Sequence, residues 1–259
     1  MSEPTSITAD RVEASPTLVA RSLVFNLAFW LWTGVMVVAA VPLLPCPRRT
    51  MVAAGRLWQR GAQRLLSALA GLSYEVRGRE RIPASPAVFA FKHQSAWETL
   101  VLHLVLADPA ITLKRELTQI PLFGWYLTRA GMIGIDRAGG GRALRTLIED
   151  SRAALARGSE IVIFPEGTRA PVGGRNPYHP GVAALYLHLE CPVVPVALNS
   201  GVFWPRRSFI KRPGRIALEF LPPIEPGLDR KRFMAELEQR LEGATERLIA
   251  EARPGRLAA

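Results

Sequence analysis

AVFAFKHQSAWE at positions 87–98 and IVIFPEGTR at positions 161–169 are the two stretches that decide the fold of this chain. Each opens with a short apolar run, 87–91 or 161–164, of the kind that predicts a buried strand. Polar side chains come just after each run: His93 lies beyond the first and Glu166 beyond the second. The strand ends of α/β sheets commonly carry the functional site. We therefore expect an α/β domain whose site lies where these two strands end.

Apolar runs and helical patterns alternate along the rest of the chain from residue 74 onward. Strands are expected at 74–77, 87–91, 112–113, 132–135, 161–164, 193–198 and 216–220, and helices at 97–106, 142–157, 182–189 and 229–251. This alternation predicts a layered, mixed sheet flanked by helices. The predicted α/β domain occupies residues 73–259.

The segment before this domain contains a long uncharged run. Residues 1–21 are polar and predict a tail, whereas no charged residue occurs from Ser22 to Pro47. The stretch 22–44 is longer than the roughly 20 residues that cross a hydrocarbon core, which favours a spanning helix. However, Trp30 and Trp32 lie near its middle, and tryptophan prefers the membrane interfaces. A half-inserted helix is therefore an open alternative.

A basic segment follows the uncharged run. Arg49, Arg56, Arg60 and Arg64 are spaced so that they share one helical face. A basic amphipathic helix of this kind is suited to the lipid head-group layer. The alternative is a helix packed on the α/β domain with its arginines in solvent. Residues 22–72 are thus expected to form a membrane-associated helical hairpin, with the arginines on the cytoplasmic side by the positive-inside rule.

The composition limits the classes of molecule that this chain is expected to bind. A net charge of +11 and a mean hydropathy of +0.13 suit an anionic membrane surface or an acidic substrate. We expect no nucleic-acid partner, because no nucleic-acid-binding motif is visible. The cysteines Cys46 and Cys191 do not form a disulfide framework. The four histidines lack metal-ligand spacing, so we expect no metal.

His93 and Glu98 are the candidate catalytic pair. A neutral imidazole can accept the proton of an alcohol as its oxygen attacks a carbonyl. Five residues of separation rule out a shared helical face, so we expect His93 in the turn after its strand and Glu98 in the first helical turn, reaching back. There the carboxylate would orient the imidazole and stabilise its charged form. The alternative is an ordinary surface histidine.

Four motifs in order resemble the 1-acylglycerol-3-phosphate acyltransferase family. The family's first motif is histidine, four residues and aspartate, and its third is FPEGTR, which is complete at 164–169. The spacing of the second motif is met by Lys114, Leu117, Gly124 and Arg137, and the fourth resembles 193–196. The resemblance covers roughly residues 74–222. One departure is Glu98, which stands where the family usually has aspartate.

The resemblance implies transfer of a fatty acyl chain from acyl-CoA or acyl carrier protein to the free hydroxyl of 1-acylglycerol 3-phosphate, giving phosphatidate. No cofactor is implied beyond the acyl donor, and the setting is a bacterial-type inner membrane with the catalytic domain on its cytoplasmic face. His93 and Glu98 would be catalytic. The acceptor and its phosphate would be bound by Lys114, Arg137, Glu166, Gly167, Thr168 and Arg169. Two alternatives are acylation of another lysolipid, such as lyso-ornithine lipid, and a catalytically silent lipid-binding protein.

Two further segments have expected roles. Leu122, Phe123 and Trp125 are candidates for shaping an apolar tunnel that sets acyl-chain length. A basic stretch without acidic residues contains Arg206, Arg207, Lys211, Arg212 and Arg215. It would dock lipid head groups or an acidic carrier protein, or form an ordinary solvated loop.

Overall fold

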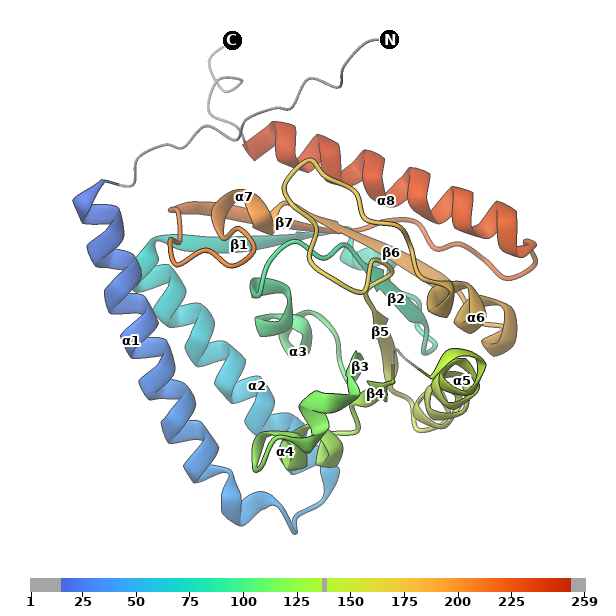
Figure 1. Ribbon diagram of the computed structural model, residues 1–259, viewed down its shortest axis with the longest axis horizontal. Helices are drawn as coiled ribbons and strands as arrows, with labels where there is room; N and C mark the ends of the chain where they lie inside the picture. The colour runs from blue at the N-terminus through green and yellow to red at the C-terminus, as the bar shows by residue number, and fades with distance from the viewer. Residues whose placement is uncertain (1–14, 137–138, 253–259) are drawn as a thin grey trace.

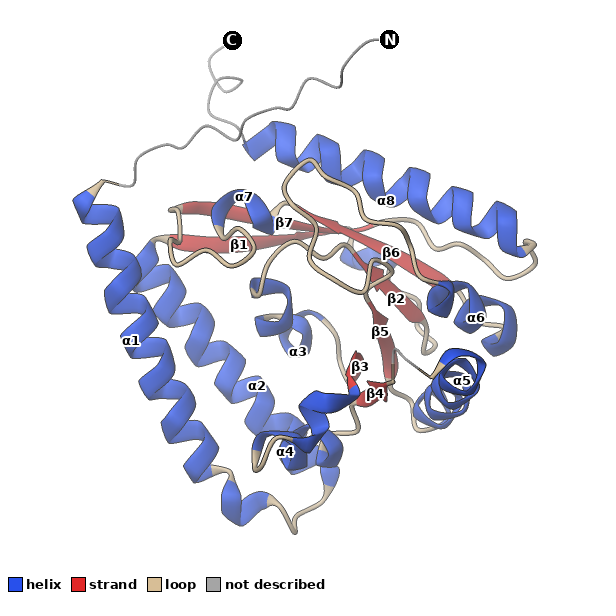
Figure 2. Cartoon of the chain, in the orientation of Figure 1, coloured by secondary structure: helices blue, strands red, loops and turns tan. Residues whose placement is uncertain are grey.

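A seven-stranded mixed sheet lies at the centre of the computed structural model, which describes residues 15–136 and 139–252 (Figures 1 and 2). Its strands are β1 (Leu72–Arg77), β2 (Val88–Phe91), β3 (Pro109–Lys114), β4 (Ile133–Ile135), β5 (Glu160–Ile163), β6 (Val193–Leu198) and β7 (Gly214–Phe220), in the spatial order β1-β7-β6-β2-β5-β3-β4. All neighbours pair in parallel except β6 and β7, which are antiparallel. The predicted mixed sheet flanked by helices is confirmed.

The pairing of β2 with β5 brings the two key stretches together. Val88 pairs with Ile161 and Ala90 with Ile163 in a parallel register. Because the strands are parallel, their carboxyl ends meet at one edge of the sheet. The loops that follow are therefore in contact, and the backbone N–H of Ala170 donates to the carbonyl of His93 at 2.8 Å.

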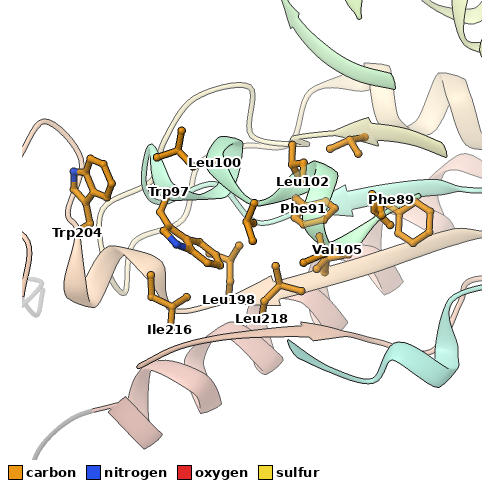
Figure 3. Close-up of a cluster of buried hydrophobic side chains, with 14 of the residues drawn as sticks. Phe89, Phe91, Trp97, Leu100, Leu102, Val105, Leu198, Trp204, Ile216 and Leu218 are labelled. Atoms are coloured by element: carbon orange, nitrogen blue, oxygen red, sulfur yellow. The ribbon is translucent and has the colours of Figure 1, made fainter. Parts of the chain in front are cut away.

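Both faces of β2 are buried. Phe89 and Phe91 join one apolar cluster with Trp97 (Figure 3), whereas Val88 and Ala90 join another cluster on the opposite face. That second cluster is covered by α5 (Gly140–Ala156), α6 (Pro180–Leu189) and α8 (Arg230–Ala252). A strand covered on both faces has a continuous apolar sequence rather than an alternating one, as 87–91 does.

The helix expected at 97–106 is broken into two pieces. A 3₁₀ turn, η4, spans Trp97–Leu100, and α3 spans Leu102–Val105. Val101 separates them with a φ of −129°. The first turn is drawn back to the preceding loop because Glu98 accepts hydrogen bonds from the backbone N–H groups of Gln94 and Ser95. The regular helix therefore restarts only after Val101.

The first helix, α1 (Pro16–Ala39), begins earlier than the uncharged run. Proline at its first position and the side chain of Ser15, which accepts the N–H of Leu18 at 3.3 Å, explain this start. Residues 16–21 therefore belong to a helix rather than to the predicted polar tail, and the remainder of that tail, 1–14, lies outside the described residues. Arg21 is accommodated because it donates to the carbonyl of Leu69.

One side of α1 is a continuous exposed apolar face. Its members are Val19, Leu23, Val24, Leu27, Trp30, Leu31, Val35 and Val38. Among the described helices, α1 is long and apolar enough to cross a membrane. Asn26 faces the protein instead, where its amide donates to Ser22 and accepts from Lys211 at 2.6 Å. An exposed apolar face of this length is suited to contact with a membrane.

The second helix, α2 (Arg48–Leu65), lies beside α1 and docks on η4 and α3 (Figure 1). Gln59 and Gln63 are buried and bond to this region, Gln63 accepting the indole N–H of Trp97 at 3.1 Å and donating to the carbonyl of Leu100 at 3.0 Å. Arg56 donates to the carbonyls of His103 and Ala107. The expectation that Arg56 faces lipid head groups is therefore wrong, because this arginine caps the end of α3.

Gln63→Leu is expected to lower the free energy of unfolding by about 2 kcal/mol, because the N–H of Trp97 and the carbonyl of Leu100 both lose a buried partner. Thermal unfolding in detergent measures this. Arg60→Gln, at an exposed position of the same helix, is the matched control. Equal melting temperatures for the two variants would contradict the docking role of Gln63.

The buried imidazole of His103 should make the free energy of unfolding depend on pH. Burial lowers its pKa to about 4, and Gln59 requires a neutral ring, because its amide nitrogen lies 3.1 Å from Nδ1 while its oxygen accepts the backbone N–H of His103. The unfolded imidazole binds a proton near its ordinary pKa of about 6.5, whereas the folded one does so only near the lower value. The stabilisation is thus present above the ordinary pKa and is lost as the pH falls through this window, by up to about 1.4 kcal/mol per pH unit.

Melting temperatures recorded between neutral and mildly acidic pH should therefore fall more steeply for the native chain than for His103→Gln. His188→Gln, at an exposed histidine, should keep the native slope. Parallel curves for the native chain and His103→Gln would contradict the assignment.

Candidate functional site

His93 lies directly after β2, at the edge where β2 and β5 end. Its ring packs on Phe164 with centroids 4.2 Å apart. The side chain is 13% exposed, so a small reacting group can reach it. Its backbone is held on both sides, because its N–H donates to Glu166 at 3.3 Å and its carbonyl accepts from Ala170. The imidazole is therefore presented from a fixed backbone.

Glu98 reaches back to His93 from the first turn of η4, as the spacing predicts. Its Oε2 lies 3.7 Å from Nδ1 of His93, an ion-pair distance rather than a hydrogen bond. Within the described residues, Nδ1 of His93 has no hydrogen-bond partner. Glu98 is fully buried and accepts from the N–H groups of Gln94 and Ser95 and from the hydroxyl of Ser200 at 2.6 Å. These donors stabilise the buried carboxylate next to the imidazole.

Sequence reasoning missed Ser200. It lies at the start of α7 (Ser200–Phe203), just beyond β6, and its contact with Glu98 joins residues 102 positions apart. The signal available in the sequence was its position two residues after the strand that contains the fourth motif.

Glu166 is turned into the protein rather than toward the cavity. It is 1% exposed, and its carboxylate accepts from Lys92 at 2.8 Å and from the backbone N–H groups of His93 and Asn176. Burial raises its pKa, and the Lys92 ammonium offsets part of that effect. The expected contact between Glu166 and acceptor hydroxyls does not fit this burial. Sequence reasoning also missed the cationic partner of Glu166, which is Lys92.

The other predicted binding residues lie at several places. Arg169 and Lys114 line the same cavity as His93, and Lys114 is half exposed, 3.4 Å from Glu116. Gly167 has a φ of +59°, and a Cβ there would lie 2.7 Å from the ring of His179, so a larger residue does not fit. Thr168 is exposed. Arg137 lies outside the described residues.

A cavity of about 740 Å³ extends from His93, Lys114 and Arg169 to the two N-terminal helices, α1 and α2. Its lining combines His93, Lys114 and Arg169 with apolar side chains from α1, α2 and α4 (Phe123–Arg129), among them Met36, Val37, Met51, Trp58, Phe123 and Leu127. Its volume is typical of a small-molecule site. Phe123 contributes to it as expected, whereas Leu122 and Trp125 are not part of the lining, and Trp125 is exposed.

The basic stretch after α7 contains one buried residue, Lys211. Lys211 is 2% exposed, donates to Asn26 on α1 and to the carbonyl of Phe209, and lies 4.5 Å from the ring centre of Trp204. Burial lowers its pKa to about 8. Lys211 is therefore unavailable for head groups or a carrier protein, because it joins the loop to α1. Arg206 is exposed and donates to the carbonyl of Arg169 at 3.1 Å.

Comparisons with known proteins show which family this chain resembles. Residues 73–199 match the family described as Acyltransferase. A Pseudomonas aeruginosa protein named 1-acyl-sn-glycerol-3-phosphate acyltransferase is 37% identical over 243 residues, which cover 94% of this chain and 93% of that protein. A protein of the same name from Cocos nucifera is 27% identical, over 75% of this chain and 62% of its own length.

A solved structure shares the fold. The 1-acyl-sn-glycerophosphate (LPA) acyltransferase PlsC from Thermotoga maritima superposes with a TM-score of 0.72 at 21% identity, over 88% of this chain and 97% of that one. With the full-length similarity to the Pseudomonas protein, the chain belongs to the 1-acyl-sn-glycerol-3-phosphate acyltransferase family.

Proposed function

We propose that this chain transfers a fatty acyl group from a thioester, acyl-CoA or acyl carrier protein, to the free hydroxyl of 1-acylglycerol 3-phosphate and so makes phosphatidate. The observation that carries the proposal is that His93, backed by Glu98, lines a large apolar cavity together with Arg169 and Lys114. A base, an apolar pocket and two cations match an acyl chain and a phosphorylated alcohol. The names of the full-length relatives support the same acceptor.

The mechanism begins with proton transfer to His93. Its Nε2 takes the acceptor's hydroxyl proton as the oxygen attacks the thioester carbonyl, and Glu98 stabilises the imidazolium that forms. The tetrahedral intermediate then collapses, its carbon–sulfur bond breaks, and the imidazolium returns its proton to the leaving thiolate. The products are the new ester and the free thiol, and His93 is again neutral.

In this proposal, cationic side chains bind the phosphate of the acceptor. The guanidinium of Arg169 matches phosphate oxygens in a bidentate way, and Lys114 and Arg137 complete the proposed set. Gly167 permits the tight turn between β5 and Arg169, and Thr168, an exposed residue of the same loop, would donate its hydroxyl to the phosphate. Glu166 has the supporting role of holding the loop, which its contacts with Lys92 and His93 favour.

The proposed setting is the cytoplasmic face of a bacterial-type inner membrane. Contacts of α1 with the rest of the protein extend from Arg21, bonded to Leu69, to Val37, whose carbonyl accepts the hydroxyl of Tyr126. A helix held along its length on one side has lipid on the other side only, which favours half insertion over a full span. Arg49, Arg60 and Arg64 are exposed and suit anionic head groups.

His93→Ala should lower kcat by about 100- to 10,000-fold, the usual contribution of a general base. Purified protein in mixed micelles would be assayed with labelled acyl-CoA and acyl-carrier-protein donors and with lysophosphatidate, lyso-ornithine lipid and glycerol 3-phosphate as acceptors. His188→Ala, at an exposed histidine, should keep full activity. Turnover confined to lyso-ornithine lipid would contradict the acceptor, and a folded native chain inactive with every pair would favour a lipid-binding protein.

Gly55→Leu should shift donor preference toward shorter acyl chains. Gly55 lines the cavity, and a Cβ there meets nothing nearer than His103 at 4.0 Å, so the new side chain fills space that the acyl chain would occupy. The ratio of kcat/KM for palmitoyl over decanoyl donors is expected to fall about tenfold. Gly34→Leu, on the exposed side of α1, is the matched control, and an equal change in both variants would contradict the cavity's role.

A further inference from the structure

A buried cluster of three charged side chains lies beneath the catalytic loop. Lys92 is 0% exposed, and its ammonium donates to Glu166 at 2.8 Å and to both carboxylate oxygens of Glu242 at 2.7 and 2.9 Å. Glu242 belongs to α8 and is 3% exposed. The three residues come from the end of β2, the loop after β5 and the C-terminal helix.

The cluster is satisfied by hydrogen bonds as well as by charge. The hydroxyl of Tyr178 donates to Glu242 at 2.8 Å, and Arg175 lies 4.0 Å from the same carboxylate. Buried charges are tolerated only when they are paired in this way. Removing one partner strongly destabilises the fold, because the remaining charges are then buried without compensation. Lys92 therefore cannot move without disturbing both carboxylates.

The cluster is connected directly to the proposed base. Lys92 immediately precedes His93, and Glu166, which Lys92 holds, accepts the backbone N–H of His93. The other oxygen of Glu166 binds Lys92 and the N–H of Asn176. Glu242 thus acts on the position of His93 through two intermediates, Lys92 and Glu166.

Glu242 lies outside the part of the chain that matches the acyltransferase family description, which ends at residue 199. The helix that carries it is firmly placed, because α8 packs on β6 and the Leu248 carbonyl accepts the side-chain amide of Asn199 at 2.9 Å. A charge on a rigid helix is suited to fixing a loop.

We propose that Glu242 is a positioning residue for acyl transfer, which holds Lys92 and, through Glu166, sets the backbone of His93 against the substrate. The proposal rests on the proposed function. A displacement of a catalytic group by about 1 Å costs about 100-fold in rate, so a loosened cluster affects turnover more than binding.

Glu242→Gln should lower kcat about tenfold and Glu242→Leu about 100-fold, with KM for donor and acceptor changed less than twofold. Glu242→Asp, which keeps the charge, should retain more activity than the glutamine variant. Glu236→Gln is the matched control, because Glu236 pairs with Arg240 on the same helix away from the cluster. Native turnover in both Glu242→Gln and Glu242→Leu would overturn the proposal, as would a loss confined to KM.

A double-mutant cycle tests whether Glu242 acts through Lys92. In a Lys92→Met background, Glu242→Gln should have little further effect on kcat, because the link is already broken. Independent, multiplying losses would overturn the proposed route. If Lys92→Met does not fold, the comparison of aspartate and glutamine at position 242 still decides between a positioning charge and a neutral packing role.

An NMR measurement that does not depend on turnover distinguishes a failure of this proposal from a failure of the proposed function. Only four histidines occur in the chain, so ¹⁵N-histidine labelling in micelles resolves the His93 amide, assigned by its absence in His93→Gln. That signal should move in Glu242→Gln and stay in place in Glu236→Gln. A moved signal in a chain that acylates no acceptor would contradict the proposed function but support the link, and an unmoved signal would overturn the link.

Discussion

The parallel ladder between β2 and β5 is the constraint on which the site depends. It joins strands whose positions differ by about 70 residues in sequence and places their carboxyl ends at one edge. Three contacts of the candidate base follow from this pairing, because the ring of Phe164, the carboxylate of Glu166 and the N–H of Ala170 all come from the segment after β5. Because both strands are buried on both faces, a shift of register would move large apolar side chains against different neighbours at high cost.

The charges of the site have two different tasks. Glu98 and Glu166 are buried, and each accepts several hydrogen bonds, so they organise the loops from within. Lys114 and Arg169 line the cavity instead. Under the proposed function, this division leaves the cations to meet a phosphorylated acceptor, whereas the carboxylates are held inside by Lys92, Ser200 and backbone donors. A low-dielectric interior makes such bonds strong when they are complete and costly when one is lost.

The two N-terminal helices, α1 and α2, contribute to the candidate site as well as to the proposed membrane contact. Side chains of α1 and α2 form part of the cavity wall. Gln59 and Gln63 dock α2 on the turn that carries Glu98, and Lys211 joins α1 to the loop after α7. The exposed apolar face of α1, which we propose to contact lipid, and the cavity proposed for the acyl chain therefore share this helix as a common wall.

The sequence by itself determined the α/β class, most strand positions and the pair His93 and Glu98, because apolar runs and ordered motifs are local signals. It also placed Arg169 and Phe123 correctly beside the cavity. Only the tertiary structure decided the partners of Glu166, the inward turn of Arg56 and Lys211, and the contacts of Ser200 and Glu242. Most of these contacts join residues 47 to 189 positions apart. Neither composition nor spacing determines which buried donor meets which acceptor once the chain is packed.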